Sequence, residues 1–220
     1  MCGRFTMTLP VGTMTQLFDA VPNNDLPSVP DFNVCPTQQI YVIVPGDKRR
    51  LVSMRWGFIP RWYKSPMDGP LLINARSETI AQKPAFWEAC RMRRCLIPMS
   101  GFYEWSKTLD EKRKPWYVHA KEPLVVAGIW QDWGPGKMST CAIVTCPANK
   151  KMSVIHARMP VILRQESWGH WMGETDQKAA PLMTAVCDDF LQYYSVDTAV
   201  NSNKATGAGL ILPMKAHLYS

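Results

Sequence analysis

Short hydrophobic runs separated by turn residues dominate the chain. Runs rich in β-branched and aromatic residues, typical of strands, lie at residues 40–44, 51–56, 71–75, 95–98, 102–105, 116–119, 124–129, 141–145 and 161–163. Hydrophobic residues at helical spacing are fewer, and they predict short helices at 13–21, 84–92, 165–172 and 187–191. The pattern therefore predicts an α+β fold, made mainly of antiparallel strands with flanking short helices, and not a βαβ series.

The organisation of the chain is uniform, with 18 prolines and 13 glycines spread along its 220 residues. No repeat or change in composition marks a linker, so we expect a single domain over residues 1–220. The charged run 110–114 predicts the tip of a hairpin, and the small residues at 205–209 predict a flexible loop. The longest apolar runs, such as 124–130, are too short to span a membrane, and no signal region begins the chain. We therefore expect a cytoplasmic protein, associated with the nucleoid, or a nuclear one in a eukaryote.

Composition narrows the choice of partner and cofactor. The chain has 25 Lys and Arg against 18 Asp and Glu, a net charge of +7, which fits either a nucleic-acid partner or a solvated basic surface. Its nine tryptophans serve either as packing residues or as stacking faces for unpaired bases. The seven cysteines contain no CxxC pair, and the two CxxxxC spacings are too wide for a zinc site. We therefore expect no metal and no cofactor, with the thiols other than Cys2 acting as small buried residues.

Cys2 carries the most distinctive chemistry, because removal of Met1 would make it the first residue. Its α-amine and thiol would then sit on adjacent carbons, and both ionise not far above neutral pH. The amine can form a Schiff base with an aldehyde, after which the thiol can close a five-membered thiazolidine ring. Alternatively, the amine can activate the thiol as in an amidohydrolase. Arg4 adds a cation nearby, suited to lowering the thiol pKa or to binding a phosphate.

Three further segments carry polar groups that could serve such a nucleophile. If residues 73–79 are extended, Asn74, Arg76 and Glu78 share one face, which fits either phosphate binding or a surface Arg–Glu pair. Glu104 lies in an aromatic strand, so it is either on a solvent face or in a desolvated site suited to acid–base work. His156 precedes an arginine and a proline, and it is either a proton carrier or a structural histidine.

Taken together, these segments resemble the family of SOS response-associated peptidases (SRAP), the abasic-site processing proteins. The matching stretches, in the family's order, are Met1-Cys-Gly-Arg4, Phe32-Asn-Val-Cys-Pro36, Trp56-Gly-Phe-Ile-Pro60, Asn74-Ala-Arg-Ser-Glu-Thr79, Arg94-Cys-Leu-Ile-Pro98, Gly101-Phe-Tyr-Glu-Trp105 and Ile155-His-Ala-Arg-Met-Pro160. Each stretch is weak by itself, but seven in order over nearly the whole chain are highly specific. The resemblance implies a compact SRAP-type domain with a β-barrel-like core.

The resemblance also implies an activity and a set of residues. It implies covalent capture of abasic sites in single-stranded DNA, as a thiazolidine crosslink through the mature N-terminal Cys2, by a monomer without a membrane partner. The catalytic residues it implies are Cys2, Asn74, Glu104 and His156, where Asn74 holds the opened sugar, Glu104 moves protons and His156 helps form and reverse the link. The DNA-binding residues it implies, with Trp105 as a stacking aromatic, are Arg4, Asn33, Arg76, Trp105 and Arg158.

Two positions depart from the family pattern, and three other functions compete. Ala157 stands where the family usually has an acid, which bears on the orientation of His156, and Cys35 stands where a small residue is usual. The competing functions are an N-terminal-nucleophile amidohydrolase or glutamine amidotransferase, a peptidase, and a non-catalytic single-strand-binding module. Release of ammonia from glutamine would favour the amidotransferase, and turnover of an added peptide would favour the peptidase. Protection of an abasic strand by a variant without Cys2 would favour the binding module.

Overall fold

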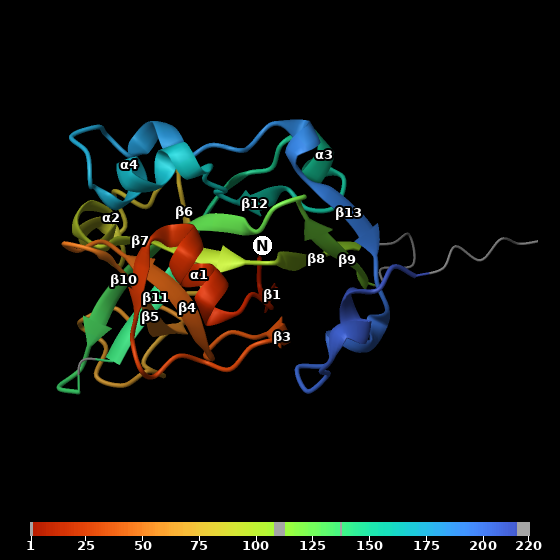
Figure 1. Ribbon diagram of the computed structural model, residues 1–220, viewed down its shortest axis with the longest axis horizontal. Helices are drawn as coiled ribbons and strands as arrows, with labels where there is room; N and C mark the ends of the chain where they lie inside the picture. Colours follow the sequence, from red (N-terminus) through yellow and green to blue (C-terminus); the bar gives the residue numbers. More distant parts are fainter. Residues whose placement is uncertain (1, 108–112, 137, 215–220) are drawn as a thin grey trace, which may run out of the picture.

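The computed structural model describes residues 2–107, 113–136 and 138–214, and it is built mainly of antiparallel strands (Figure 1). The strands are β1 (Arg4–Met7), β2 (Ala20–Pro22), β3 (Asp31–Val34), β4 (Gln39–Val44), β5 (Arg49–Trp56), β6 (Asn74–Arg76), β7 (Arg94–Met99), β8 (Gly101–Lys107), β9 (Arg113–His119), β10 (Leu124–Trp133), β11 (Met138–Pro147), β12 (Arg158–Pro160) and β13 (Gln192–Ser195). The α-helices are α1 (Val11–Phe18), α2 (Trp87–Met92), α3 (Lys150–Ser153) and α4 (Trp168–Met172). Five 3₁₀ helices cover Gln165–Ser167, Ala180–Leu182, Asp188–Phe190, Thr198–Asn201 and Ala208–Ile211.

Five strands close into a barrel, in the order β11-β10-β7-β4-β5. The ring is completed by a parallel pairing of β5 with β11, in which Arg55 lies opposite Thr140. Residues that are fully buried in this core include Ile43, Leu96 and Ile143, all apolar and taken from three different strands. The expected α+β fold with a barrel-like core is therefore confirmed, while the extent of one domain stays a prediction.

A second sheet, with strand order β13-β9-β8-β1-β3, holds the start of the chain as an inner strand (Figure 1). On one side Phe5 in β1 pairs with Phe102 in β8, and on the other side it pairs with Val34 in β3. Its ring packs edge-on against Trp56 of the barrel, with ring centroids 5.0 Å apart. The Trp56 indole also donates a hydrogen bond of 3.1 Å to the carbonyl of Ile73, directly before β6. One buried side chain thus ties both β1 and β6 to the barrel.

The predicted helix at 13–21 is wrong at both ends. It begins at Val11 and stops at Asp19, whose left-handed φ of 48° ends it. The following Ala20–Pro22 forms β2, which runs parallel to β5. The predicted helix at 165–172 is confirmed, as a 3₁₀ turn at Gln165–Ser167 that continues into α4 at Trp168–Met172. The predictions at 84–92 and 187–191 are too long, because turns precede α2 and only a 3₁₀ turn forms at Asp188–Phe190.

Several strand and loop predictions also shift. The predicted strand 71–75 is Asn74–Arg76, where Glu78 already lies in the following turn and no longer shares the strand face. The predicted strand 161–163 is Arg158–Pro160 instead, with a single bridge from Ile162 to Val126. The short strands β1, β2, β3 and β13 were not predicted, because their sequences carry too little pattern.

Three further sequence predictions meet the structure only in part. Residues 110–112 of the predicted hairpin tip lie outside the described chain, but β8 and β9 do pair as a hairpin up to Lys107 and Arg113. The predicted flexible loop at 205–209 runs into the 3₁₀ helix Ala208–Ile211, whose Leu210 is buried. Among the thiols other than Cys2, five are buried as predicted, but Cys187 is exposed.

We expect Trp56→Phe to destabilise the protein by about 1–3 kcal/mol, since it leaves the Ile73 carbonyl without its buried donor and opens a small void. Urea unfolding followed by circular dichroism measures this cost. The exposed Trp87→Phe serves as the matched control, with a change within about 0.5 kcal/mol. Equal costs for the two variants would contradict the anchoring role of Trp56.

Candidate active site at the N-terminal strand

Cys2 lies two residues before the start of β1, and none of its surface is exposed. Its carbonyl oxygen accepts a hydrogen bond of 2.9 Å from the side-chain amide of Asn74. Asn74 is the first residue of β6, which pairs in parallel with β11 of the barrel wall, Asn74 opposite Ile143. The structure therefore brings together two predicted catalytic residues that are 72 positions apart in the chain.

The Asn74 amide retains one unused group. Its Oδ1 atom is buried and accepts no hydrogen bond from the described residues. A buried acceptor without a donor is costly, so such an atom at a site is suited to take a donor from a ligand. A hydroxyl group is one such donor, and it would meet Asn74 next to the Cys2 backbone.

Glu104 is buried in β8, with 3% of its surface exposed, which decides between the two positions left open by the sequence. Its Oε1 atom accepts a hydrogen bond of 3.2 Å from the backbone N–H of Trp105. Its negative charge acts on Cys2: burial first, and then the charge of Glu104, raise the pKa of the Cys2 thiol to about 12. A hydrogen bond from the backbone N–H of Arg4 opposes this shift.

The raised pKa determines the protonation state of the Cys2 thiol before any reaction. At neutral pH the sulfur carries its proton, because a thiolate would be both desolvated and repelled by the carboxylate. A reaction through this sulfur must therefore move its proton to an acceptor as the new bond forms. The charge of Glu104 raises the pKa of this sulfur, and a carboxylate is a chemical group able to accept a proton.

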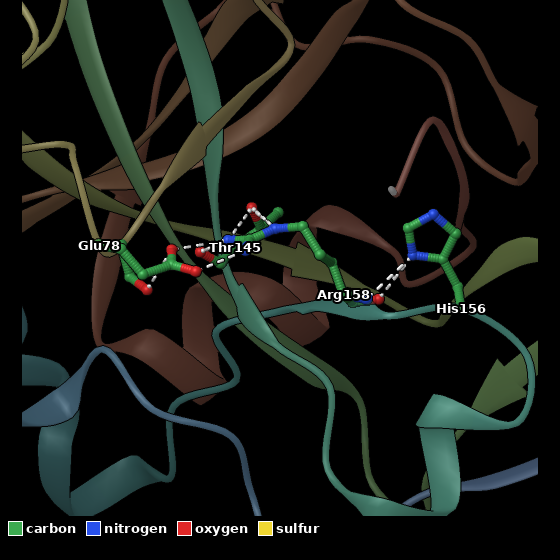
Figure 2. A network of polar contacts seen from close by, with 5 residues as sticks. Glu78, Thr145, His156 and Arg158 are labelled. Atoms are coloured by element: carbon green, nitrogen blue, oxygen red, sulfur yellow. Dashed lines mark hydrogen bonds and ion pairs between the residues drawn. The ribbon is translucent and has the colours of Figure 1, made fainter.

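His156 is oriented by the backbone of Arg158 (Figure 2). Its Nδ1 atom lies 3.0 Å from the Arg158 nitrogen and 3.2 Å from the Arg158 oxygen. The neutral ring can accept from that N–H at Nδ1, and a ring protonated at Nδ1 can donate to that carbonyl. The backbone of Arg158 thus offers the ring a hydrogen-bond partner in either form, while the effect of Ala157 stays a prediction.

Arg158 is itself held in a network with Glu78 and Thr145 (Figure 2). Its guanidinium makes a two-pronged ion pair with the Glu78 carboxylate, at 2.6 and 2.9 Å, and donates at 2.7 Å to the Thr145 carbonyl. Hydrogen bonds from Arg158 hold the pKa of Glu78 down at about 2. The Arg–Glu pair expected at this surface therefore exists, but it is formed by Arg158 and not by Arg76.

Arg4 and Asn33, both predicted to bind DNA, are buried and bind the C-terminal part of the chain. Arg4 donates at 2.6 Å to the Asn33 side chain and at 2.9 Å to the carbonyl of Val200. The Asn33 amide donates at 3.1 Å to the carbonyl of Ser202 and at 2.6 Å to that of Ala205. Arg4 and Asn33 thus hold the C-terminal segment against the site. Arg76, by contrast, is exposed on β6.

A cavity of about 800 Å³ has four of the nine predicted site residues in its lining, namely Arg4, Glu104, Trp105 and His156. It is lined by Gly3, Arg4, Glu104, Trp105, Arg113, Ser153, Ile155, His156, Ala157 and Asn201. Cys2 and Asn74 do not line it, nor do Asn33, Arg76 and Arg158, but Cys2 is the chain neighbour of Gly3, which does. Sequence reasoning did not assign Arg113, which lies in the predicted hairpin tip, or Asn201, which lies in no patterned segment, because only the fold carries these two residues to the cavity.

The described residues contain neither a cluster suited to a metal ion nor a helix suited to span a membrane. No cluster of three or more His, Cys, Asp or Glu side chains able to hold a metal ion is found there. None of the helices in these residues is long and apolar enough to cross a membrane.

The fold and the site define an α+β barrel protein in which Cys2 is held by the Asn74 amide and is influenced by the charge of the Glu104 carboxylate. The chain belongs to the SRAP family, SOS response associated peptidase, whose model matches residues 1–203. It is 37% identical to the abasic site processing protein YoaM of Bacillus subtilis, over 96% of this chain and 97% of that protein. It is 29% identical to the abasic site processing protein YedK of Escherichia coli, over 97% and 100%. A crystal structure of a Bacteroides thetaiotaomicron protein has the same fold, with a TM-score of 0.85, 22% identity and coverage of 97% and 100%.

We expect Glu78→Gln to lower the stability at neutral pH by about 0.5–1 kcal/mol, because Glu78 is partly exposed and solvent screens the pair. The pKa of Glu78 is about 2 in the folded protein, below its ordinary value, so the pair stabilises fully above about pH 4.5. The difference between wild type and variant should shrink as the pH falls from 4.5 towards 2. Urea midpoints measured across this range check it, and a difference that stays constant would contradict it.

Proposed function

We propose that this protein captures abasic sites in single-stranded DNA and shields them as a covalent crosslink through Cys2. The observation that carries the proposal is the position of Cys2, which is held by Asn74, lies under the charge of Glu104 and precedes Gly3 of a cavity that Arg4, Glu104 and His156 also line. Its relatives in bacteria and yeast are named abasic site processing proteins, which supports DNA with abasic sites as the target.

The first step of the proposed mechanism exposes the amine. Hydrolysis of the peptide bond between Met1 and Cys2 consumes one water and releases methionine, so that Cys2 becomes the first residue with a free α-amine. We take this removal to be autocatalytic. The hydrogen bond from Asn74 to the Cys2 carbonyl lies on the far side of Cys2 from the broken bond, so it persists through the step.

The second step forms the crosslink. The amine adds to the aldehyde carbon of the ring-opened sugar, and loss of one water leaves a Schiff base. The Cys2 sulfur then adds to the same carbon while its proton passes by way of Glu104 to the nitrogen, which closes a thiazolidine ring. No oxidant or reductant is needed, and one water is released overall.

Asn74, His156 and two arginines have separate tasks in this proposal. The Oδ1 atom of Asn74 accepts a hydrogen bond from a sugar hydroxyl, which orients the aldehyde carbon towards Cys2. His156 faces the cavity and supplies or takes the proton that ring closure and opening require, so release is slow but possible. Arg76 and Arg113 are exposed cations able to bind DNA phosphates, so the affinity for DNA should fall as the salt concentration rises.

The decisive test uses single-stranded DNA with one abasic site on a denaturing gel. We expect a heat-stable adduct for the wild type and none for Cys2→Ser, which keeps the amine but has a hydroxyl that closes the ring poorly. Reduction with borohydride should trap the Schiff base of this variant. The matched control is Cys187→Ala, which removes an exposed thiol and should crosslink as the wild type does. A heat-stable adduct of equal yield with Cys2→Ala would refute the mechanism.

We expect Asn74→Ala to slow adduct formation by about tenfold to a hundredfold, because it removes the donor to the Cys2 carbonyl and the acceptor offered to the sugar. The rate is read from the time course of the same gel at saturating DNA. Asn24→Ala, at an exposed position, is the control and should leave the rate unchanged. A normal rate for Asn74→Ala would remove Asn74 from the mechanism.

A further inference from the structure

Asn201, the last residue of the 3₁₀ helix Thr198–Asn201, lines the cavity together with Trp105, and no part of the proposed chemistry uses it. Its Oδ1 atom accepts a hydrogen bond of 2.7 Å from the indole N–H of Trp105. This contact joins two residues that are 96 positions apart, so it depends wholly on the fold.

We propose that Asn201 is a positioning residue, which fixes the Trp105 indole as a stacking surface for an unpaired DNA base; this rests on the proposed binding of single-stranded DNA. An indole can rotate about its side-chain bonds, and a surface that stacks on a base must be held in one orientation before the base arrives. The hydrogen bond at its N–H edge removes this freedom.

The other side of the indole is supported by Arg4. The guanidinium carbon of Arg4 lies 5.8 Å from the centre of the Trp105 ring, in a cation–π contact. Arg4 is in turn anchored to the same C-terminal segment, at the carbonyl of Val200 and at the side chain of Asn203. The segment 200–203 thus holds the indole twice, directly at its edge and through Arg4 at its face.

The segment itself is firmly placed, so Asn201 can serve as a fixed point. Val200 is fully buried in a small apolar cluster with Tyr103, Tyr117 and Leu210. The Asn33 side chain binds the next turn at the carbonyls of Ser202 and Ala205. The Asn201 side chain therefore projects from an anchored backbone, and it is exposed enough to be replaced without disturbing the core.

The first test observes the indole in the protein without DNA. The N–H proton of Trp105 is assigned by nuclear magnetic resonance as the indole signal that Trp105→Phe removes. We expect Asn201→Ala to shift this signal towards that of a solvent-exposed indole and to speed its exchange with water at least tenfold. Asn201→Asp keeps an oxygen acceptor and should restore slow exchange. The thermal midpoint, measured alongside, should stay close to that of the wild type.

The second test is a double-mutant cycle on the affinity for an undamaged single-stranded oligonucleotide. Asn201→Ala should weaken binding by about three- to tenfold in the wild-type background and by less than about 1.5-fold in the Trp105→Phe background, because the phenyl ring has no N–H to hold. Asn24→Ala should have no effect in either background.

Two outcomes would overturn the proposal. One is an unchanged affinity for Asn201→Ala in the wild-type background, and the other is an equal loss in both backgrounds, which would mean that Asn201 acts without Trp105. Failure of the proposed function gives a different result. In that case the cycle comes out as expected, but no adduct forms with the abasic strand.

Discussion

The site depends on one constraint, which is that the first strand of the chain is an inner strand of a sheet. Chain ends usually fray because few contacts hold them. Here β1 is hydrogen-bonded to β8 on one side and to β3 on the other, and Phe5 packs on Trp56 of the barrel. The Asn74 amide then holds the carbonyl of Cys2, none of whose surface is exposed. In the proposed mechanism this anchoring presents the amine of Cys2 to the substrate in one orientation.

The same burial also sets the chemistry. A desolvated thiol beside a carboxylate keeps its proton, and the pKa of Cys2 rises to about 12. In the proposed mechanism such a sulfur needs a proton acceptor at the moment of ring closure. We assign this task to Glu104, which is buried in the neighbouring strand β8 and accepts a hydrogen bond from the backbone N–H of Trp105. In this proposal the carboxylate that raises the thiol pKa also takes the proton of the thiol.

The sequence predicted the barrel and part of the site, for reasons that can be traced to particular segments. Barrel strands such as β4 and β10 are long and apolar, so their pattern identifies them without knowledge of their partners. The strands β1 and β3 have four residues each, of mixed character, and only their pairing across the sheet defines them. Asn201 has no periodic pattern around it, and it reaches the cavity through a fold contact with Trp105. Arg158 was predicted to bind DNA. Its ion pair with Glu78 could not be predicted, because the two residues lie 80 positions apart in the chain.

The central claim, that the amine and the thiol of Cys2 together hold the abasic sugar, is tested most directly by mass spectrometry of the crosslinked N-terminal peptide. The account predicts a peptide that begins at Cys2, carries the sugar with the loss of one water, takes up no hydrogen from borohydride and has no thiol left to alkylate. A peptide that still begins with Met1, a link that borohydride reduces, or attachment of the sugar to a lysine would contradict it.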